Sequence, residues 1–136
     1  VKEANEKLIE HCSESADSGF YEIVQLTKRA IKDTYGYEMS NPIMVGRNKS
    51  RHDYNIVLYL QLLRDKQGNA VKFVRYGSCC RYTTEKGLRS EGLMERYRVT
   101  YKNEKGKEEQ KTLYFTFYDF DKPKVPNGFD TNHDIY

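Results

Sequence analysis

LMERYRVTY, residues 93–101, and TLYFTFY, residues 112–118, are the two stretches of sequence that decide the fold. In both, large apolar residues such as Tyr97 and Val99 alternate with charged or small polar residues. A period of two with β-branched and aromatic residues is typical of strands, because successive side chains point to opposite faces of a sheet. The two stretches therefore predict a β-hairpin with one apolar face and a charged loop around Gly106.

Shorter strand patterns flank this hairpin. The run VKFVRY at 71–76 predicts a strand, and residues 43–45 predict a short one. The run IVLYLQLL at 56–63, which precedes the strand at 71–76, has apolar residues at every even position. The turn at 65–69 would join these two segments as a second hairpin. A helix over 56–63 fits the same residues and stays open. Three glycines and several polar residues make 77–92 a long connection.

The N-terminal part of the sequence predicts helices. Residues 1–12 read as a short helix, and apolar residues recur at three-to-four spacing over 20–35, with Gly36 in place for a left-handed C-terminal cap. An amphipathic helix must bury its apolar stripe. The sequence therefore predicts an α+β fold, with N-terminal helices packed on one face of a four- to five-stranded antiparallel sheet, as in cystatin-like or NTF2-like shapes. The predicted domain is 1–129, followed by a polar C-terminal tail, 130–136.

Length and composition point to a single polar domain. The chain has 136 residues, 38% of them hydrophobic, with 12 Tyr, 6 Phe and a net charge of +3 from mixed charges. Such an aromatic content argues against global disorder, and the small net charge disfavours a nucleic-acid partner. No apolar run reaches the 18 or so residues that a membrane-spanning helix needs. The sequence starts at Val1, which fits a trimmed, exported form or a choice of boundary.

Several motifs resemble those of uncharacterised small exported or lipoprotein-type proteins of Bacteroidetes bacteria. The residues that carry the resemblance are N-P-I-x-V-G at 41–46 and G-S-C-C at 77–80, within a similar region over 35–129. Arg81-Tyr82 departs from the proline-containing continuation expected after the cysteines. The resemblance implies an exported location, periplasmic or at the cell surface, and it implies no activity. A cytoplasmic location stays open.

The G-S-C-C segment is the most unusual feature of the sequence. Cys79 and Cys80 follow a predicted strand, and a reactive thiolate there would need a nearby base or cation, such as His52. Cys12 is the third cysteine, and a bridge from it to either neighbour stays open, whereas adjacent cysteines rarely bridge each other. A buried or structural role for the pair is the more common outcome.

Basic and aromatic side chains follow the predicted strands. On one face of the sheet they would form a binding surface able to stack on and pair with a partner, although Arg, Thr and Tyr also pair well across strands on a solvated face. The candidate binding residues, some of them on the cysteine-bearing segment, are Arg75, Tyr76, Ser78, Arg81, Tyr82, Arg96 and Arg98, with Lys72, Lys102, Tyr114 and Tyr118 nearby.

Other chemistry is weakly supported. The sequence has no metal motif of zinc or calcium type, so we expect no metal site and no cofactor. Asp119 and Asp121 fall on the same side of a strand, and they would act as acid and base only in a cleft. The sequence therefore favours a non-catalytic bacterial binding or interaction domain with an unknown protein, small-molecule or glycan partner. The alternative is a small thiol-dependent enzyme or redox protein that uses Cys79 or Cys80.

Overall fold

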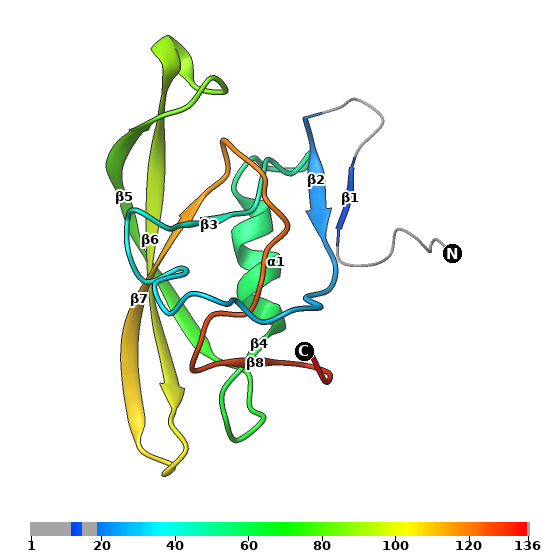
Figure 1. Cartoon of the computed structure of the whole chain (residues 1–136), viewed down its shortest axis with the longest axis vertical. Helices are drawn as coiled ribbons and strands as arrows, with labels where there is room; N and C mark the ends of the chain where they lie inside the picture. The colour runs from blue at the N-terminus through cyan, green and yellow to red at the C-terminus, as the bar shows by residue number, and fades with distance from the viewer. Residues whose placement is uncertain (1–11, 15–18, 136) are drawn as a thin grey trace.

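The expected hairpin forms the centre of the molecule. A computed structural model describes residues 12–14 and 19–135 of the chain (Figure 1). β6 (Glu91–Lys102) and β7 (Glu108–Thr116) pair antiparallel, with Tyr97 opposite Leu113. The loop between them turns at Gly106, which has a φ of +79° that glycine adopts without strain. The hairpin prediction is thus confirmed.

Two further strands complete the main sheet. β5 (Lys72–Thr83) pairs antiparallel with β6, and β3 (Ile43–Met44) pairs parallel with β7, so the strand order is β3-β7-β6-β5. Two small sheets lie apart from it in the hydrogen-bonding scheme. They are formed by β1 (Cys12–Glu14) with β2 (Tyr21–Ile23), and by β4 (Leu63–Arg64) with β8 (Asp130–Thr131).

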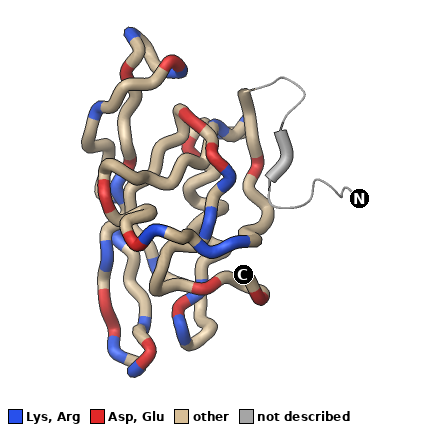
Figure 2. The backbone as a smooth tube through the Cα atoms, in the orientation of Figure 1, with Lys and Arg blue, Asp and Glu red and all other residues tan. Residues whose placement is uncertain are grey.

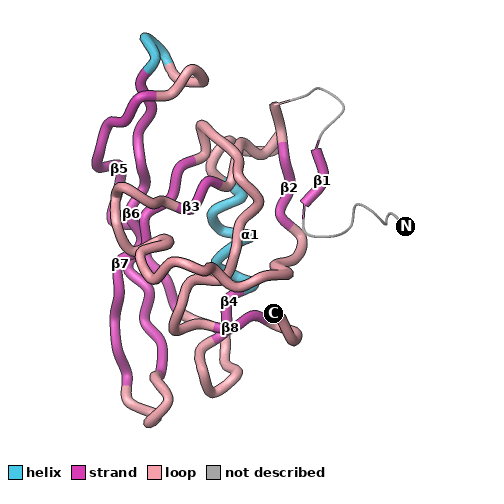
Figure 3. Tube along the Cα trace, viewed as in Figure 1, coloured by secondary structure: helices cyan, strands magenta, loops and turns pink. Residues whose placement is uncertain are grey.

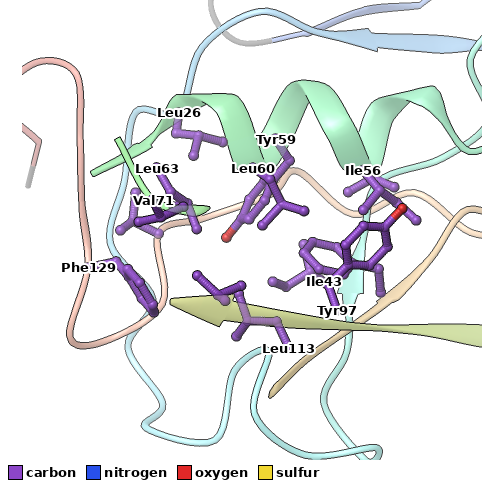
Figure 4. Close-up of a cluster of buried hydrophobic side chains, with 14 of the residues drawn as sticks. Leu26, Ile43, Ile56, Tyr59, Leu60, Leu63, Val71, Tyr97, Leu113 and Phe129 are labelled. Atoms are coloured by element: carbon purple, nitrogen blue, oxygen red, sulfur yellow. The ribbon is translucent and has the colours of Figure 1, made fainter. Parts of the chain in front are cut away.

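One α-helix, α1 (Tyr54–Leu62), covers the apolar face of the hairpin (Figure 4). Ile56, Tyr59 and Leu60 of this helix are almost completely buried. The Tyr59 ring meets Phe115 of β7 edge to face, with ring centroids 5.4 Å apart, a favourable arrangement for aromatic pairs. The apolar face of the hairpin therefore lies under a helix.

Of the two interpretations left open for 56–63, the favoured strand is wrong and the helix is right, because residues up to Leu62 belong to α1 and Leu63 begins β4. The buried residues of α1, Asn55, Ile56, Tyr59 and Leu60, recur at helical spacing. The alternating apolar residues at even positions fit both structures, so the pattern could not separate them. The turn at 65–69 is present, but it joins β4 to β5 rather than two long strands.

The helix predicted over 20–35 is also wrong (Figure 3). This segment contains β2 and then runs without helix, and its backbone bonds with a distant segment: the N–H of Ala30 donates to the carbonyl of Val125. Its apolar residues do not share a buried stripe, since Leu26 is buried whereas Ile31 is 93% exposed. Gly36 has the expected positive φ, of +83°, but it belongs to a turn rather than to a helix cap.

These two corrections change the fold class. Among the described residues there are no N-terminal helices on the sheet; Cys12 is in a strand, and residues 1–11 lie outside the described part. The expected α+β class and its cystatin-like or NTF2-like shape are therefore wrong. Residues 12–14 and 19–135 form a mainly β fold with an antiparallel-rich sheet and one α-helix.

The predicted connection at 77–92 and the predicted C-terminal tail also differ from the structure. Residues 77–92 are not a long connection, because β5 continues to Thr83 and β6 begins at Glu91, with only a short 3-10 turn (Leu88–Ser90) between them. At the C-terminus, Phe129 is fully buried, and the segment expected as a polar tail begins with strand β8. The chain thus remains attached to the fold up to Thr131.

Asn55 joins three parts of the molecule around the start of α1. Its side-chain carbonyl accepts hydrogen bonds from the Ile23 N–H and from the Asn48 side chain. Its amide donates to the carbonyls of Tyr21, Val45 and Gly46. This buried amide therefore stabilises the position of α1 relative to β2 and to the segment after β3.

None of the described helices has the length and apolar character required to cross a membrane.

Candidate functional site

The face of β5–β6–β7 opposite α1 is the most extensive open surface of the sheet. Figure 1 shows α1 and the β1–β2 pair on the other side. Alternation and strand register place one set of residues on this face, and each of them is exposed or half-buried. We call it the outer face; it comprises Lys72, Val74, Tyr76, Arg96, Arg98, Thr100, Lys102, Glu108, Gln110, Thr112 and Tyr114.

The centre of the outer face is an arginine stacked on a tyrosine. The guanidinium carbon of Arg98 lies 4.6 Å from the centroid of the Tyr76 ring, and Arg98 also donates to Gln110 at 2.9 Å. Tyr76 is 53% exposed and its neighbour Val74 is 61% exposed. An accessible ring, an accessible aliphatic side chain and a cation therefore lie together on the outer face.

Arg96 extends this group towards β7. It lies opposite Gly77 on one side and Tyr114 on the other. Its Nε is buried and has no hydrogen-bond partner among the described residues.

The outer face is basic even though the chain as a whole is nearly balanced. Figure 2 shows Lys and Arg interspersed with Asp and Glu along most of the chain. On the outer face four cations, Lys72, Arg96, Arg98 and Lys102, accompany one acid, Glu108. A partner with an acidic surface would be complementary to it.

Arg75 and Ser78, although predicted as binding residues, lie on the inner side of the sheet. Both contact the buried carboxylate of Glu95: an Arg75 nitrogen lies 2.7 Å from Glu95 Oε1, and the Ser78 hydroxyl donates to Oε2 at 2.7 Å. The hydrogen bond with Glu95 and its charge raise the pKa of Arg75, which stays a cation. Arg75 and Ser78 are themselves exposed, and with the buried Glu95 they form a polar cluster on the inner side of the sheet rather than part of the outer face.

Tyr82 and Arg81 also separate from the outer-face group. The Tyr82 hydroxyl donates to Asp119 at 2.9 Å and lies 2.7 Å from the hydroxyl of Thr116. Burial raises the pKa of Tyr82 well above the usual value for tyrosine. Arg81 pairs with Glu91 across the strands at 3.0 Å, in an exposed position.

The predicted thiol site has a different form from the one expected. Cys79 and Cys80 form a disulfide with each other, so neither is bridged to Cys12. The ring of His52 lies near Phe20 and Phe117, with centroids 6.4 Å away from each. His52 therefore lies in an aromatic setting, and the sulfur atoms are bonded rather than present as thiolates.

Asp119 and Asp121, the two acids after β7, contact different parts of the molecule. The carboxylate of Asp119 accepts hydrogen bonds from Tyr82 and from Thr84, while the backbone N–H of Asp121 donates to Met44. Asp119 thus connects the tip of the β5–β6 hairpin to the segment after β7. Over 12–14 and 19–135, no three His, Cys, Asp or Glu residues are grouped so that they could hold a metal ion.

A hollow lies beside β4 and β8. It has a volume of about 850 Å³ and is lined in part by Arg29, Lys66 and Asp130. Asp130 accepts from Arg29 at 2.6 Å and lies 3.3 Å from the Lys66 ammonium, so these three charges are already paired with one another. This hollow contains none of the residues predicted from the sequence as binding residues.

Part of the outer face was foreseeable from the sequence, and part was not. Tyr76, Arg96 and Arg98 were predicted and the structure brings them together. The exposed Val74 was missed, although its position next to Arg75 in an alternating strand was the available signal. In comparisons with protein-family models, curated proteins and solved structures, none matches this chain.

Proposed function

We propose that this chain is a non-catalytic binding domain whose outer face recognises an acidic surface of a protein partner. The observation that carries the proposal is the exposed Tyr76–Arg98 stack, with Val74 and Arg96 beside it. Tyrosine and arginine are enriched among residues that dominate protein–protein binding energy. The excess of cations on this face favours a partner of opposite charge.

Catalysis receives less support, because the candidate reactive groups are engaged in other interactions. Cys79 is bonded to Cys80, and Asp119 accepts two side-chain hydrogen bonds. An exported location, as the resemblance implies, is part of the same proposal. It agrees with the disulfide, since disulfides persist mainly in oxidising compartments.

A displayed random-peptide library, selected on the immobilised chain, tests the proposal. We expect the selected peptides to be enriched in Asp and Glu next to aromatic or aliphatic residues. The double substitution Tyr76→Ser/Arg98→Ser should weaken their binding by roughly tenfold or more, as loss of central interface residues does. Surface plasmon resonance gives the affinities, and circular dichroism checks that each variant is folded.

The matched control is a second Arg–Tyr pair away from the outer face. Arg51 lies 5.5 Å from the ring centroid of Tyr54, so Arg51→Ser/Tyr54→Ser makes the same chemical change elsewhere. The control should bind the selected peptides as wild type does. Equal loss in both variants, or binding unaffected by the outer-face change, contradicts the proposal. Outer-face-dependent binding of heparin without peptide binding would indicate a polysaccharide partner instead.

A second candidate function, a small thiol-dependent redox protein, is favoured by the Cys79–Cys80 disulfide alone. Such a protein would oxidise a substrate dithiol to a disulfide, its own disulfide taking up two electrons and two protons, and glutathione disulfide would reoxidise the pair. A dithiol peptide with glutathione disulfide as terminal oxidant tests this. Turnover that the Cys79→Ser/Cys80→Ser variant lacks would support the redox function.

A further inference from the structure

Three sulfur atoms gather at one irregular point of strand β5. Cys79 and Cys80 are joined to each other, and Cys80 Sγ lies 2.9 Å from Met39 Sδ. A sulfur already in a disulfide carries no proton, so this is a contact between sulfur atoms rather than a hydrogen bond. Both cysteines are half-buried, and Met39 is 51% exposed. The cluster is therefore within reach of solvent and of a small ion.

The backbone on both sides explains why the three atoms meet. Cys79 and Cys80 fall where the pairing of β5 with β6 shifts register, between Ser78 and Arg81. Such a bulge turns side chains away from regular alternation. Met39 lies in a turn closed by the Gly36 N–H, which donates to the Asn41 carbonyl at 2.8 Å. The carbonyl of Gly36 in turn accepts from Tyr114 of β7, which ties the turn to the sheet.

We propose that, once the disulfide is reduced, the sulfur atoms of Cys79, Cys80 and Met39 bind one Cu(I) ion. A dithiol reductant supplies two electrons and two protons to the S–S bond and is itself oxidised to a disulfide. Cu(I) then replaces the two thiol protons, which are released to solvent, and the thioether donates a lone pair as third ligand. The ion keeps its oxidation state throughout.

The ligand types select the metal. Thiolate and thioether sulfur are soft donors and favour Cu(I), whereas Mg²⁺ and Ca²⁺ require oxygen ligands. Structural zinc sites use four Cys, His or carboxylate ligands. In the described part of the chain, not even three His, Cys, Asp or Glu residues are grouped so that they could hold a metal ion. The carboxylates of Glu95 and Glu91 on the paired strand are in use, because Glu95 bonds with Arg75 and Glu91 with Arg81. Glu38, which precedes Met39, accepts from the Ser40 hydroxyl at 3.4 Å. Sulfur is therefore the donor that this point of the surface offers.

Competition with bicinchoninate tests the site with Cu(I) as the probe. A Cys12→Ser background leaves Cys79 and Cys80 as the only thiols. The protein is reduced with dithiothreitol, desalted without oxygen and titrated into the violet Cu(I)–bicinchoninate complex. We expect the reduced protein to withdraw one equivalent of copper, seen as loss of visible absorbance. The oxidised protein should withdraw none.

Two variants decide whether the thioether takes part. Met39→Leu keeps the volume but removes the third sulfur, and it should weaken Cu(I) binding by roughly tenfold, as loss of one of three donors would. Met44→Leu, at a half-buried methionine of β3, is the control and should leave the affinity unchanged. The proposal is overturned if the reduced protein withdraws no copper. It is equally overturned if Met39→Leu binds as tightly as Met44→Leu.

Discussion

The hydrogen bonds of Asn55 offer the sharpest test of how this fold is held together. The side chain is fully buried and takes part in five hydrogen bonds, which connect α1 to β2 and to the segment after β3. Asn55→Ala would leave the N–H of Ile23 and the carbonyls of Tyr21, Val45 and Gly46 without this partner. The first of these is a buried backbone donor, the kind of group that is rarely left unpaired.

The expected cost follows from these groups. A buried polar group that loses its partner costs about 1–3 kcal/mol, and the three carbonyls share only two amide protons. We therefore expect Asn55→Ala to lower the free energy of unfolding by about 3–5 kcal/mol. Since small domains are stable by only about 5–15 kcal/mol, this is a large fraction of the total.

Urea denaturation followed by circular dichroism measures the effect, because the chain has no Trp for fluorescence. Asn55→Leu is the second variant: it nearly fills the space yet cannot bond, so it should be about as unstable as Asn55→Ala. Asn132→Ala, at an exposed asparagine, should stay within about 0.5 kcal/mol of wild type. A loss below about 1 kcal/mol in Asn55→Ala, or recovery in Asn55→Leu, would refute the role of the hydrogen bonds.

The remaining predictions concern the sheet faces and alkaline pH. Phe115→Ala should lower the free energy of unfolding, measured by urea denaturation, by about 3–5 kcal/mol, because the side chain is fully buried under α1. Tyr114→Ala, on the outer face, should lower it much less. Equal losses would mean that the two faces of the sheet are misassigned. Burial raises the pKa of Tyr59 and of Tyr35 above the ordinary 10.0. Their contribution to stability is complete below pH 10 and is lost as pH rises towards the folded values. For each of these two tyrosines, the raised pKa should lower the free energy of unfolding by about 1.4 kcal/mol per pH unit above 10. Tyrosinate absorbance should then appear partly in a cooperative step with unfolding, and a simple titration of all tyrosines near pH 10 would contradict this.

The outer face shows how far sequence reasoning reached for the site. Simple alternation along β5 places Tyr76 and Ser78 on the same side. The structure instead has register shifts between Arg75 and Gly77 and between Ser78 and Arg81. Each shift inserts an extra residue and reverses the faces that follow. Ser78 thus turns inward to Glu95, while Tyr76 stays with Arg98.

The sequence by itself determined the hairpin of β6 and β7 and its buried face. Period-two alternation is a local property, and burial of one side of a strand requires nothing beyond it. The short strand at Ile43 and the turn at Gly106 were readable for the same reason. Their signals lie within a few residues of each other.

Only the tertiary structure decided the two segments whose patterns fit more than one element. Residues 20–35 have helical spacing, yet Ala30 bonds with Val125 across the chain, so distant backbone partners replace the helical ones. Residues 54–62 fit a strand as well as a helix, and the helix wins because it places Ile56, Tyr59 and Leu60 together on the hairpin. Propensities amount to tenths of a kcal/mol per residue, whereas burial of one large apolar side chain contributes about 1.5–3 kcal/mol. Contacts between distant segments therefore outweigh the local pattern where that pattern is ambiguous.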